Sequence, residues 1–338
     1  CFHCGAGDNP NMRIGIWGTG GIARAHTRHF ARLDGAELVM YDLDPARAEA
    51  MAATVGGRAV ATADELLAAV DGVVIAVPTD AHYACARQAL EAGKHVLLEK
   101  PITRSLEQAD ELIALAQAKG VHLVPAHVSR FFPEFVAARD RVNKGAVGTP
   151  AAIRVYRGGK APQGTEGWFQ NLARSGGVIL DLAVHDFDWL LWTFGPVERI
   201  YCRSVRMGAE ARDVPGDYAL ATITFQNGAV AHLESCWMDP LGFNIAFEVA
   251  GSEGLISFDA RAVAGLRITG AVQASGTNRD ASDDPFYGQA KMFGAVLQGA
   301  APTVSAQEGR AALALALAAE ESANTHRVIV MDPATASV

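Results

Sequence analysis

The chain has 338 residues, of which 50% are hydrophobic and 20% are charged, and its formal net charge at pH 7 is −8. This length exceeds what one hydrophobic core usually holds, so we expect a soluble globular protein of two domains. The acidic balance and the lack of a basic run argue against a nucleic-acid partner, and no apolar stretch is long enough to place the chain in a membrane.

The residues before Met12, CFHCGAGDNPN, are interpreted as a tail or a misplaced start, with residues 1–11 outside both domains. Cys1, His3 and Cys4 are of metal-ligating types, but no second ligand pair follows downstream, so we expect no metal site. The five cysteines are scattered and odd in number, which is not typical of a disulfide framework. With no signal peptide recognised, we expect a cytoplasmic protein.

Residues 12–126 alternate between short apolar runs and helical segments. We predict strands at 13–17, 37–41, 72–77, 95–98 and 121–124, and helices at 21–32, 45–53, 63–69, 81–92 and 105–119. Pro45 suits the first turn of a helix, and Ser105 with Gln108 predicts a capping box. Strands and helices that alternate at this spacing imply right-handed crossovers and a parallel sheet.

The first predicted strand runs directly into a dinucleotide-binding fingerprint of the form GxGxxA. Gly18 permits the tight turn, Gly20 lets the backbone approach a pyrophosphate, and Ala23 is small enough for close packing of helix on strand. The helix that follows offers amides and a positive dipole to phosphates. The residues of this predicted cofactor loop are Gly18, Thr19, Gly20, Gly21 and Ile22.

Asp42 follows the loop by roughly twenty residues, at the end of the second predicted strand, where a carboxylate binds the adenosine ribose hydroxyls. Its negative charge would repel a 2′-phosphate, and Leu43 beside it supplies no positive charge. We therefore predict an NAD site that disfavours NADP.

The fourth long predicted strand ends at Glu99-Lys100-Pro101, and ligands bind at the carboxyl ends of strands in this kind of sheet. A later predicted helix, 178–192, carries Asp181, His185 and Asp188 at spacings of four and three residues, which share one helix face. We interpret Asp181 as the group that orients or polarises His185 for acid–base work.

Beyond residue 126 the pattern changes to strands in series. Runs at 217–225 and 229–237 flank an Asn-Gly turn, and runs at 244–250 and 255–258 flank a Gly-rich turn, so both pairs predict hairpins. Helices are predicted at 285–297 and 306–322. We expect residues 127–338 to form an α+β substrate and oligomerisation domain with an open, mostly antiparallel sheet, whose last helices pack back on the first domain.

The motifs GIWGTGGIA, VPTDAH, EKP and GGVILDLAVHDFDW together resemble the Gfo/Idh/MocA oxidoreductases, which include glucose–fructose oxidoreductase and inositol dehydrogenases. The resemblance spans nearly the whole chain from Met12. It implies a Rossmann domain, a C-terminal open-sheet domain, and catalysis on sugars or cyclitols. It places Lys100, Asp181 and His185 in a catalytic triad, and it adds to the cofactor site Val77, Pro78, Thr79, His82, Glu99 and Lys100.

We predict an NAD-dependent dehydrogenase that oxidises a secondary alcohol. His185 is the expected general base and Lys100 the group that stabilises the oxyanion, although these two roles remain exchangeable. Further substrate contacts are expected from His127, Arg130 and Asp188, with Trp168 and Tyr287 as an aromatic wall. The bond from Lys100 to Pro101 is expected to be cis, because only X–Pro bonds adopt cis at small cost.

Two other functions stay open on the sequence. One is an enzyme that oxidises its substrate transiently and keeps NAD bound, as a glycosidase-like or epimerising enzyme would. The other is a regulator that binds dinucleotide without catalysis, which the complete triad disfavours. In the strand at 217–225 both alternating sets of side chains include apolar groups, so one face is expected to form an exposed apolar patch and to join copies of the chain into a dimer or tetramer.

Overall fold

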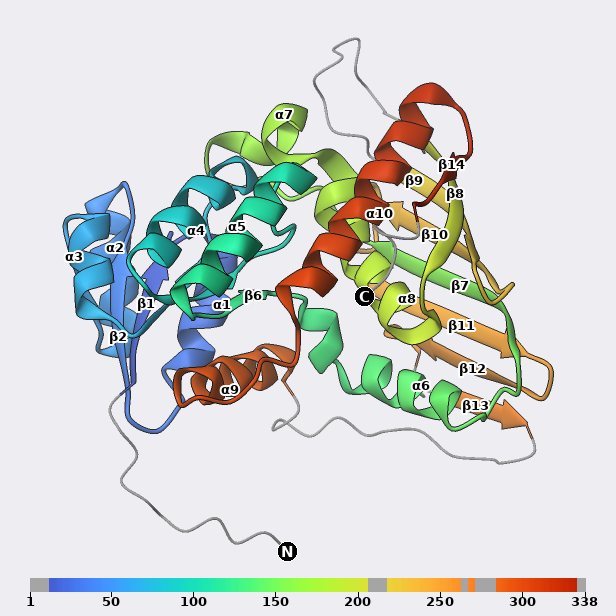
Figure 1. Ribbon diagram of the computed structural model, residues 1–338, viewed down its shortest axis with the longest axis horizontal. Helices are drawn as coiled ribbons and strands as arrows, with labels where there is room; N and C mark the ends of the chain where they lie inside the picture. The colour runs from blue at the N-terminus through green and yellow to red at the C-terminus, as the bar shows by residue number, and fades with distance from the viewer. Residues whose placement is uncertain (1–11, 206–217, 263–266, 271–283, 333–338) are drawn as a thin grey trace, which may run out of the picture.

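The computed structural model describes residues 12–205, 218–262, 267–270 and 284–332. Two lobes, each built around one sheet, lie side by side, and the long helix α10 (Ala306–Thr325) runs along the boundary between them (Figure 1). The tail that carries Cys1, His3 and Cys4 falls outside the described residues.

The first sheet has six parallel strands in the order β3-β2-β1-β4-β5-β6. This order reverses direction at β1, as in dinucleotide-binding folds, so the crevice at the carboxyl ends of β1 and β4 is the expected ligand position. The strands are β1 Met12–Trp17, β2 Ala36–Tyr41, β3 Arg58–Ala59, β4 Gly72–Ile75, β5 His95–Leu98 and β6 Leu123–Pro125, and the helices between them are α1 Gly21–Phe30, α2 Pro45–Val55, α3 Ala63–Ala69, η1 Thr79–Ala81, α4 His82–Glu91 and α5 Leu106–Lys119.

Both faces of this sheet are buried, which explains its continuous apolar strands. Ile14 and Ile16 face the side covered by α1, α2 and α9 (Pro285–Leu297), whereas Val73 and Ile75 face the side covered by α3, α4 and α5. Helix α9 comes from the end of the chain and lies against α1 and β5, where Phe293 is fully buried.

Within the part of the chain that the structure describes, the second sheet has eight strands in the order β13-β12-β11-β7-β10-β9-β8-β14. All its neighbouring pairs are antiparallel except β7 with β10, which run parallel. The predicted fold class, a Rossmann domain followed by an open, mostly antiparallel sheet domain, is confirmed. The strands are β7 Pro150–Gly158, β8 Val197–Val205, β9 Tyr218–Phe225, β10 Val230–Cys236, β11 Asn244–Gly251, β12 Gly254–Asp259, β13 Arg267–Gly270 and β14 Ile329–Val330.

One face of the second sheet packs on helices and the other is open. In β9 the side chains of Ala219, Ala221, Ile223 and Phe225 are buried in the core, where Phe225 contacts Phe194 at the end of helix α8 (Val184–Phe194), and the alternate residues are more exposed. The remaining helices of the described residues are η2 Val128–Phe131, α6 Pro133–Asn143, η3 Thr165–Gln170, α7 Leu172–Ser175, η4 Ile179–Ala183, α8 Val184–Phe194 and α10 Ala306–Thr325.

The segment predicted as one helix over 178–192 is two elements. Residues Ile179–Ala183 form a π-helical turn, η4, and the regular helix α8 begins only at Val184. A π turn closes hydrogen bonds over five residues rather than four, and such turns are frequent at functional sites. The four-residue spacing of Asp181 and His185 therefore does not carry the geometry of a regular α-helix.

Candidate active site

The loop after β1 makes the tight turn that its first glycine permits. Gly18 has φ of +88°, and a Cβ there would lie 2.7 Å from the carbonyl oxygen of Ala76. A side chain would thus collide with the backbone that leaves β4. Only glycine supplies both this backbone conformation and this close approach.

The two following glycines border open space. A Cβ at Gly20 or Gly21 would meet no protein atom within 4 Å, and α1 begins at Gly21, so the first amides of the helix are open to a ligand. Ala23 is fully buried under the same turn. This cradle fits a dinucleotide pyrophosphate, which binds where backbone and helix dipole meet it without side chains in between.

Asp42 lies directly after β2 and faces the glycine loop. Its Oδ2 accepts hydrogen bonds from the Thr19 backbone N–H at 2.7 Å and the Thr19 hydroxyl at 2.8 Å. The Asp44 backbone N–H holds the other oxygen at 3.0 Å. The carboxylate is therefore oriented next to the cradle, in the position that binds ribose hydroxyls in this fold.

Arg47 is a cation near this carboxylate that the sequence analysis did not include. It lies in the first turn of α2, where its Nε donates to Asp44 Oδ2 at 2.9 Å and its Nη1 donates to the Thr165 hydroxyl at 3.2 Å. The hydrogen bond to Asp44 raises the pKa of Arg47, with Asp42 contributing a smaller electrostatic part. The sequence does contain a signal for it. Arg47 is the third residue of a helix that Asp44 caps and Pro45 begins, and it lies five residues past Asp42.

Lys100 and Asp181 meet across the two lobes. The Lys100 Nζ donates to the Asp181 carboxylate Oδ1 and to its backbone carbonyl, each at 2.8 Å. The two side chains are 14% and 11% exposed, so the pair remains open to a small molecule. The peptide bond from Lys100 to Pro101 is cis, which confirms the prediction.

His185 lies one turn beyond Asp181, at the start of α8, and no hydrogen bond joins the two among the described residues. The interpretation of Asp181 as the orienting partner of His185 is therefore corrected: the π turn directs its carboxylate to Lys100 instead. The His185 Nδ1 is buried and has no protein partner among the described residues. Burial, reinforced by the charge of Lys100, sets the pKa of His185 well below its ordinary value, so the ring is neutral at neutral pH.

Two residues expected at the cofactor lie beneath the crevice. Glu99 is 7% exposed and accepts a hydrogen bond from His26, and His82 is 1% exposed with its two ring nitrogens near the carbonyl oxygens of Pro101 and Val77. Of the others, Thr79 is buried, whereas Ile22, Val77 and Pro78 retain exposure beside the glycine loop.

Arg130 and Asp188, expected as substrate contacts, are bonded to one another. Arg130 donates to both oxygens of Asp188, at distances from 2.7 to 3.2 Å, and also contacts Glu308 at the start of α10. Arg130 and Asp188 are each 1% exposed at the side chain. His127 is fully buried, and neither ring nitrogen has a protein partner among the described residues.

The two aromatic residues expected to line a sugar site each contact another side chain of their own region. Tyr287 stacks 3.9 Å from Arg32, beyond the last turn of α1, about 15 Å along that helix from the cofactor loop. Trp168 stacks on Phe169 with ring centroids 3.8 Å apart, in the segment that reaches Arg47 through Thr165. The aromatic wall formed by Tyr287 and Trp168 stays a prediction.

The described residues hold no group of three or more His, Cys, Asp or Glu side chains arranged for a metal ion. No described helix is long and apolar enough to cross a membrane.

The fold and the cofactor cradle define an NAD-binding oxidoreductase. Residues 12–127 match the family model described as "Oxidoreductase family, NAD-binding Rossmann fold", and residues 135–257 match its C-terminal domain. The chain belongs to this GFO/IDH/MocA family, as the resemblance implied.

Known relatives cover most of the chain. Inositol 2-dehydrogenase of Rhizobium meliloti (strain 1021) is 30% identical over 94% of this chain and 98% of the relative. UDP-N-acetylglucosamine 3-dehydrogenase of Acidithiobacillus ferrooxidans is 35% identical over 66% of each chain. GenD2 from gentamicin A biosynthesis, crystallised with NAD, superimposes with a TM-score of 0.85 at 26% identity, covering 98% of this chain and 99% of its own.

Proposed function

We propose that the protein oxidises a secondary alcohol of a sugar, a sugar derivative or a cyclitol to the carbonyl compound, with NAD as the hydride acceptor. The observation that carries this proposal is the Lys100 ammonium, held by Asp181 at the carboxyl end of β5 and beside a neutral His185. The relatives named for inositol and UDP-N-acetylglucosamine support the class of substrate.

The three residues divide the work of removing a proton from the alcohol. Lys100 donates a hydrogen bond to the reacting oxygen and stabilises its negative charge, while Asp181 fixes the direction of the ammonium. His185, already neutral, accepts the hydroxyl proton and returns it to solvent. The Gly18–Gly21 loop and Asp42 would hold NAD, which would supply the acceptor for the hydride of the carbinol carbon.

The test is a panel of polyols and sugars with NAD and with NADP, followed by absorbance of the reduced nicotinamide. Myo-inositol, UDP-N-acetylglucosamine, glucose and levoglucosan sample the three substrate classes. NADH should accumulate with at least one of them. A lack of NADH with the whole panel would contradict a dehydrogenase that releases NADH after each turnover.

A second candidate, transient oxidation with retained NAD, is favoured by two contacts. Thr165 bonds Arg47 after β2, and Arg174 Nε bonds Asp80 Oδ2 at 2.8 Å after β4. Because β2 and β4 flank β1 in the sheet, the segment 165–174 is anchored on both sides of the glycine loop. Purified protein that carries NAD and forms product without net NADH would select this candidate.

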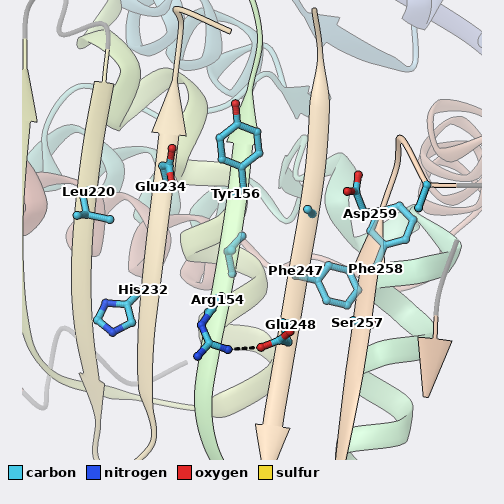
Figure 2. Close-up of a pocket in the computed structure, with 13 residues that line it drawn as sticks. Arg154, Tyr156, Leu220, His232, Glu234, Phe247, Glu248, Ser257, Phe258 and Asp259 are labelled. Carbon is cyan, nitrogen blue, oxygen red and sulfur yellow. Dashed lines mark hydrogen bonds and ion pairs between the residues drawn. The ribbon is translucent and has the colours of Figure 1, made fainter. Parts of the chain in front are cut away.

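We also propose that a second copy of the chain covers the open face of the second sheet. Figure 2 shows this face, where a hollow of about 630 Å³ is bordered by Arg154, Tyr156, His232 and Glu234. The expected apolar patch is mixed in character, because Leu220 lies beside Glu234 and His232 of the neighbouring strand β10 and the face also carries the Arg154–Glu248 ion pair. A mixed polar surface is ordinary for an interface, and a monomer by light scattering at micromolar concentration would contradict the proposal.

A further inference from the structure

Two buried histidines from different helices lie within hydrogen-bond distance of the turn that carries Lys100. His26 lies on α1 and His82 begins α4, and each is 1% exposed. We infer that His26 and His82 are positioning residues, which fix the Glu99-Lys100-Pro101 turn so that the Lys100 ammonium reaches Asp181. The inference rests on the proposed role of Lys100 in catalysis.

His26 acts on the residue before Lys100. Its Nε2 lies 2.7 Å from Glu99 Oε1, and Glu99 Oε2 accepts the backbone N–H of Lys100 at 3.2 Å. Burial raises the pKa of Glu99, but the hydrogen bond from His26 and the charge of Lys100 outweigh burial and lower it, so Glu99 is a carboxylate. An ionised acceptor requires the ring proton of His26 on Nε2, and both carboxylate oxygens are then fixed.

His82 acts on the residue after Lys100. Its Nδ1 lies 2.8 Å from the Pro101 carbonyl oxygen, and its Nε2 lies 3.1 Å from the Val77 carbonyl oxygen. Burial lowers the pKa of His82, so the neutral ring has one N–H to donate, and the nearer Pro101 carbonyl is the better acceptor. Because His82 begins α4, which follows β4 through η1, this bond ties the turn to the segment after the neighbouring strand.

These contacts matter because the Lys100 side chain has to reach Asp181 in the other lobe. Its Nζ meets Asp181 at 2.8 Å from a backbone that is held directly before and directly after it. A displacement of about 1 Å at a reacting group costs roughly 100-fold in rate, even when the change lies away from the chemistry. Loss of either histidine should therefore lower kcat without weakening cofactor binding.

His29 provides a matched control on the same helix. It is 2% exposed, and it contacts Asp284 and Phe286 rather than the Lys100 turn. His29→Leu should thus reproduce the packing defect of His26→Leu without moving Lys100.

The kinetic test compares these variants with NAD and whichever of myo-inositol, UDP-N-acetylglucosamine, glucose or levoglucosan supports NADH formation. His26→Leu and His82→Leu should lower kcat about 100-fold, with KM and the NAD dissociation constant within about threefold of wild type. His26→Gln places an amide N–H where Nε2 was, and His82→Asn places one where Nδ1 was, so both should recover most of the lost kcat. Equal losses in His26→Leu and His29→Leu, or no recovery with Gln and Asn, would overturn the inference.

A structural test needs no turnover, so it stands even if the proposed function fails. Crystal structures should show Lys100 Nζ beyond hydrogen-bond reach of Asp181 in His26→Leu, and still at 2.8 Å in His29→Leu. An unmoved Lys100 in His26→Leu would contradict the inference. If His26→Leu does not fold, Glu99→Gln takes its place, because it weakens the same contact at nearly constant volume, and wild-type kinetics of that variant would be equally decisive.

Discussion

One helical segment carries aspartates that meet cations in two different regions. Asp181, in the π turn, bonds Lys100 across the boundary between the lobes, and its side chain stays 11% exposed. Asp188, two turns on, bonds Arg130 within the second lobe, and both side chains are 1% exposed. A charge pair that a ligand can still reach is suited to catalysis, whereas a fully buried pair whose members bond one another is suited to stabilising the fold.

The largest expected effect lies in the open region. His185→Ala and Lys100→Met should each lower kcat by about 10² to 10⁴, because a positioned acid–base group contributes that much. The NAD dissociation constant should change little, since the phosphate and ribose contacts lie on the Gly18 loop and Asp42. Steady-state kinetics with fluorescence titration of NADH separates the two quantities, and His185→Ala with more than about a tenth of wild-type kcat would rule out His185 as the base.

Substitution in the buried Arg130–Asp188 pair should change the free energy of unfolding instead. Arg130→Met leaves the Asp188 carboxylate buried without its cation, which costs about 3–5 kcal/mol of unfolding free energy. Urea unfolding followed by tryptophan fluorescence measures the loss. The surface pair Arg87–Glu91 offers the control, because Arg87→Met should leave the unfolding free energy close to that of the wild type. Arg130→Met with normal stability and no activity would instead place Arg130 in the chemistry.

The sequence predicted these regions unequally, for a physical reason. The glycine loop and Asp42 are recognised because a local turn and the strand that follows it determine them. Strand β7 was missed because its partners β10 and β11 lie far along the chain and no hairpin marks it. The π turn was missed because residue spacing does not reveal a change of hydrogen-bond register, and the His26 contact because Glu99 lies 73 residues away.

A smaller effect is expected on the pH dependence of the unfolding free energy, through histidines that are buried in the neutral form. Burial lowers the pKa of His82 and of His127, so as pH falls the unfolded chain binds protons at these histidines before the native state does. Stability is then fully present above the unfolded pKa of about 6.5 and falls as pH drops below it, by up to about 1.4 kcal/mol per pH unit for each such histidine. Unfolding free energies from pH 8 to pH 5 test this dependence, and His127→Leu should flatten the slope by about one proton. An unchanged slope would mean that His127 is protonated in the native state.

The smallest expected effect concerns the choice of cofactor, and it compares two aspartates that lie side by side. Asp42 faces the loop through Thr19, whereas Asp44 caps α2 and neutralises Arg47. Asp42→Ala removes charge-assisted hydrogen bonds to the ribose, which contribute about 1.5–3 kcal/mol, so kcat/KM with NAD should fall at least about tenfold. The repulsion of a 2′-phosphate disappears at the same time, so kcat/KM with NADP should rise and the preference for NAD should narrow. Asp44→Ala is the matched control: it frees Arg47 but leaves Asp42 in place, so NAD should remain preferred by nearly the wild-type ratio. If wild type uses both cofactors equally, or if Asp44→Ala narrows the ratio more than Asp42→Ala does, then the charge on Arg47 rather than that on Asp42 governs the choice.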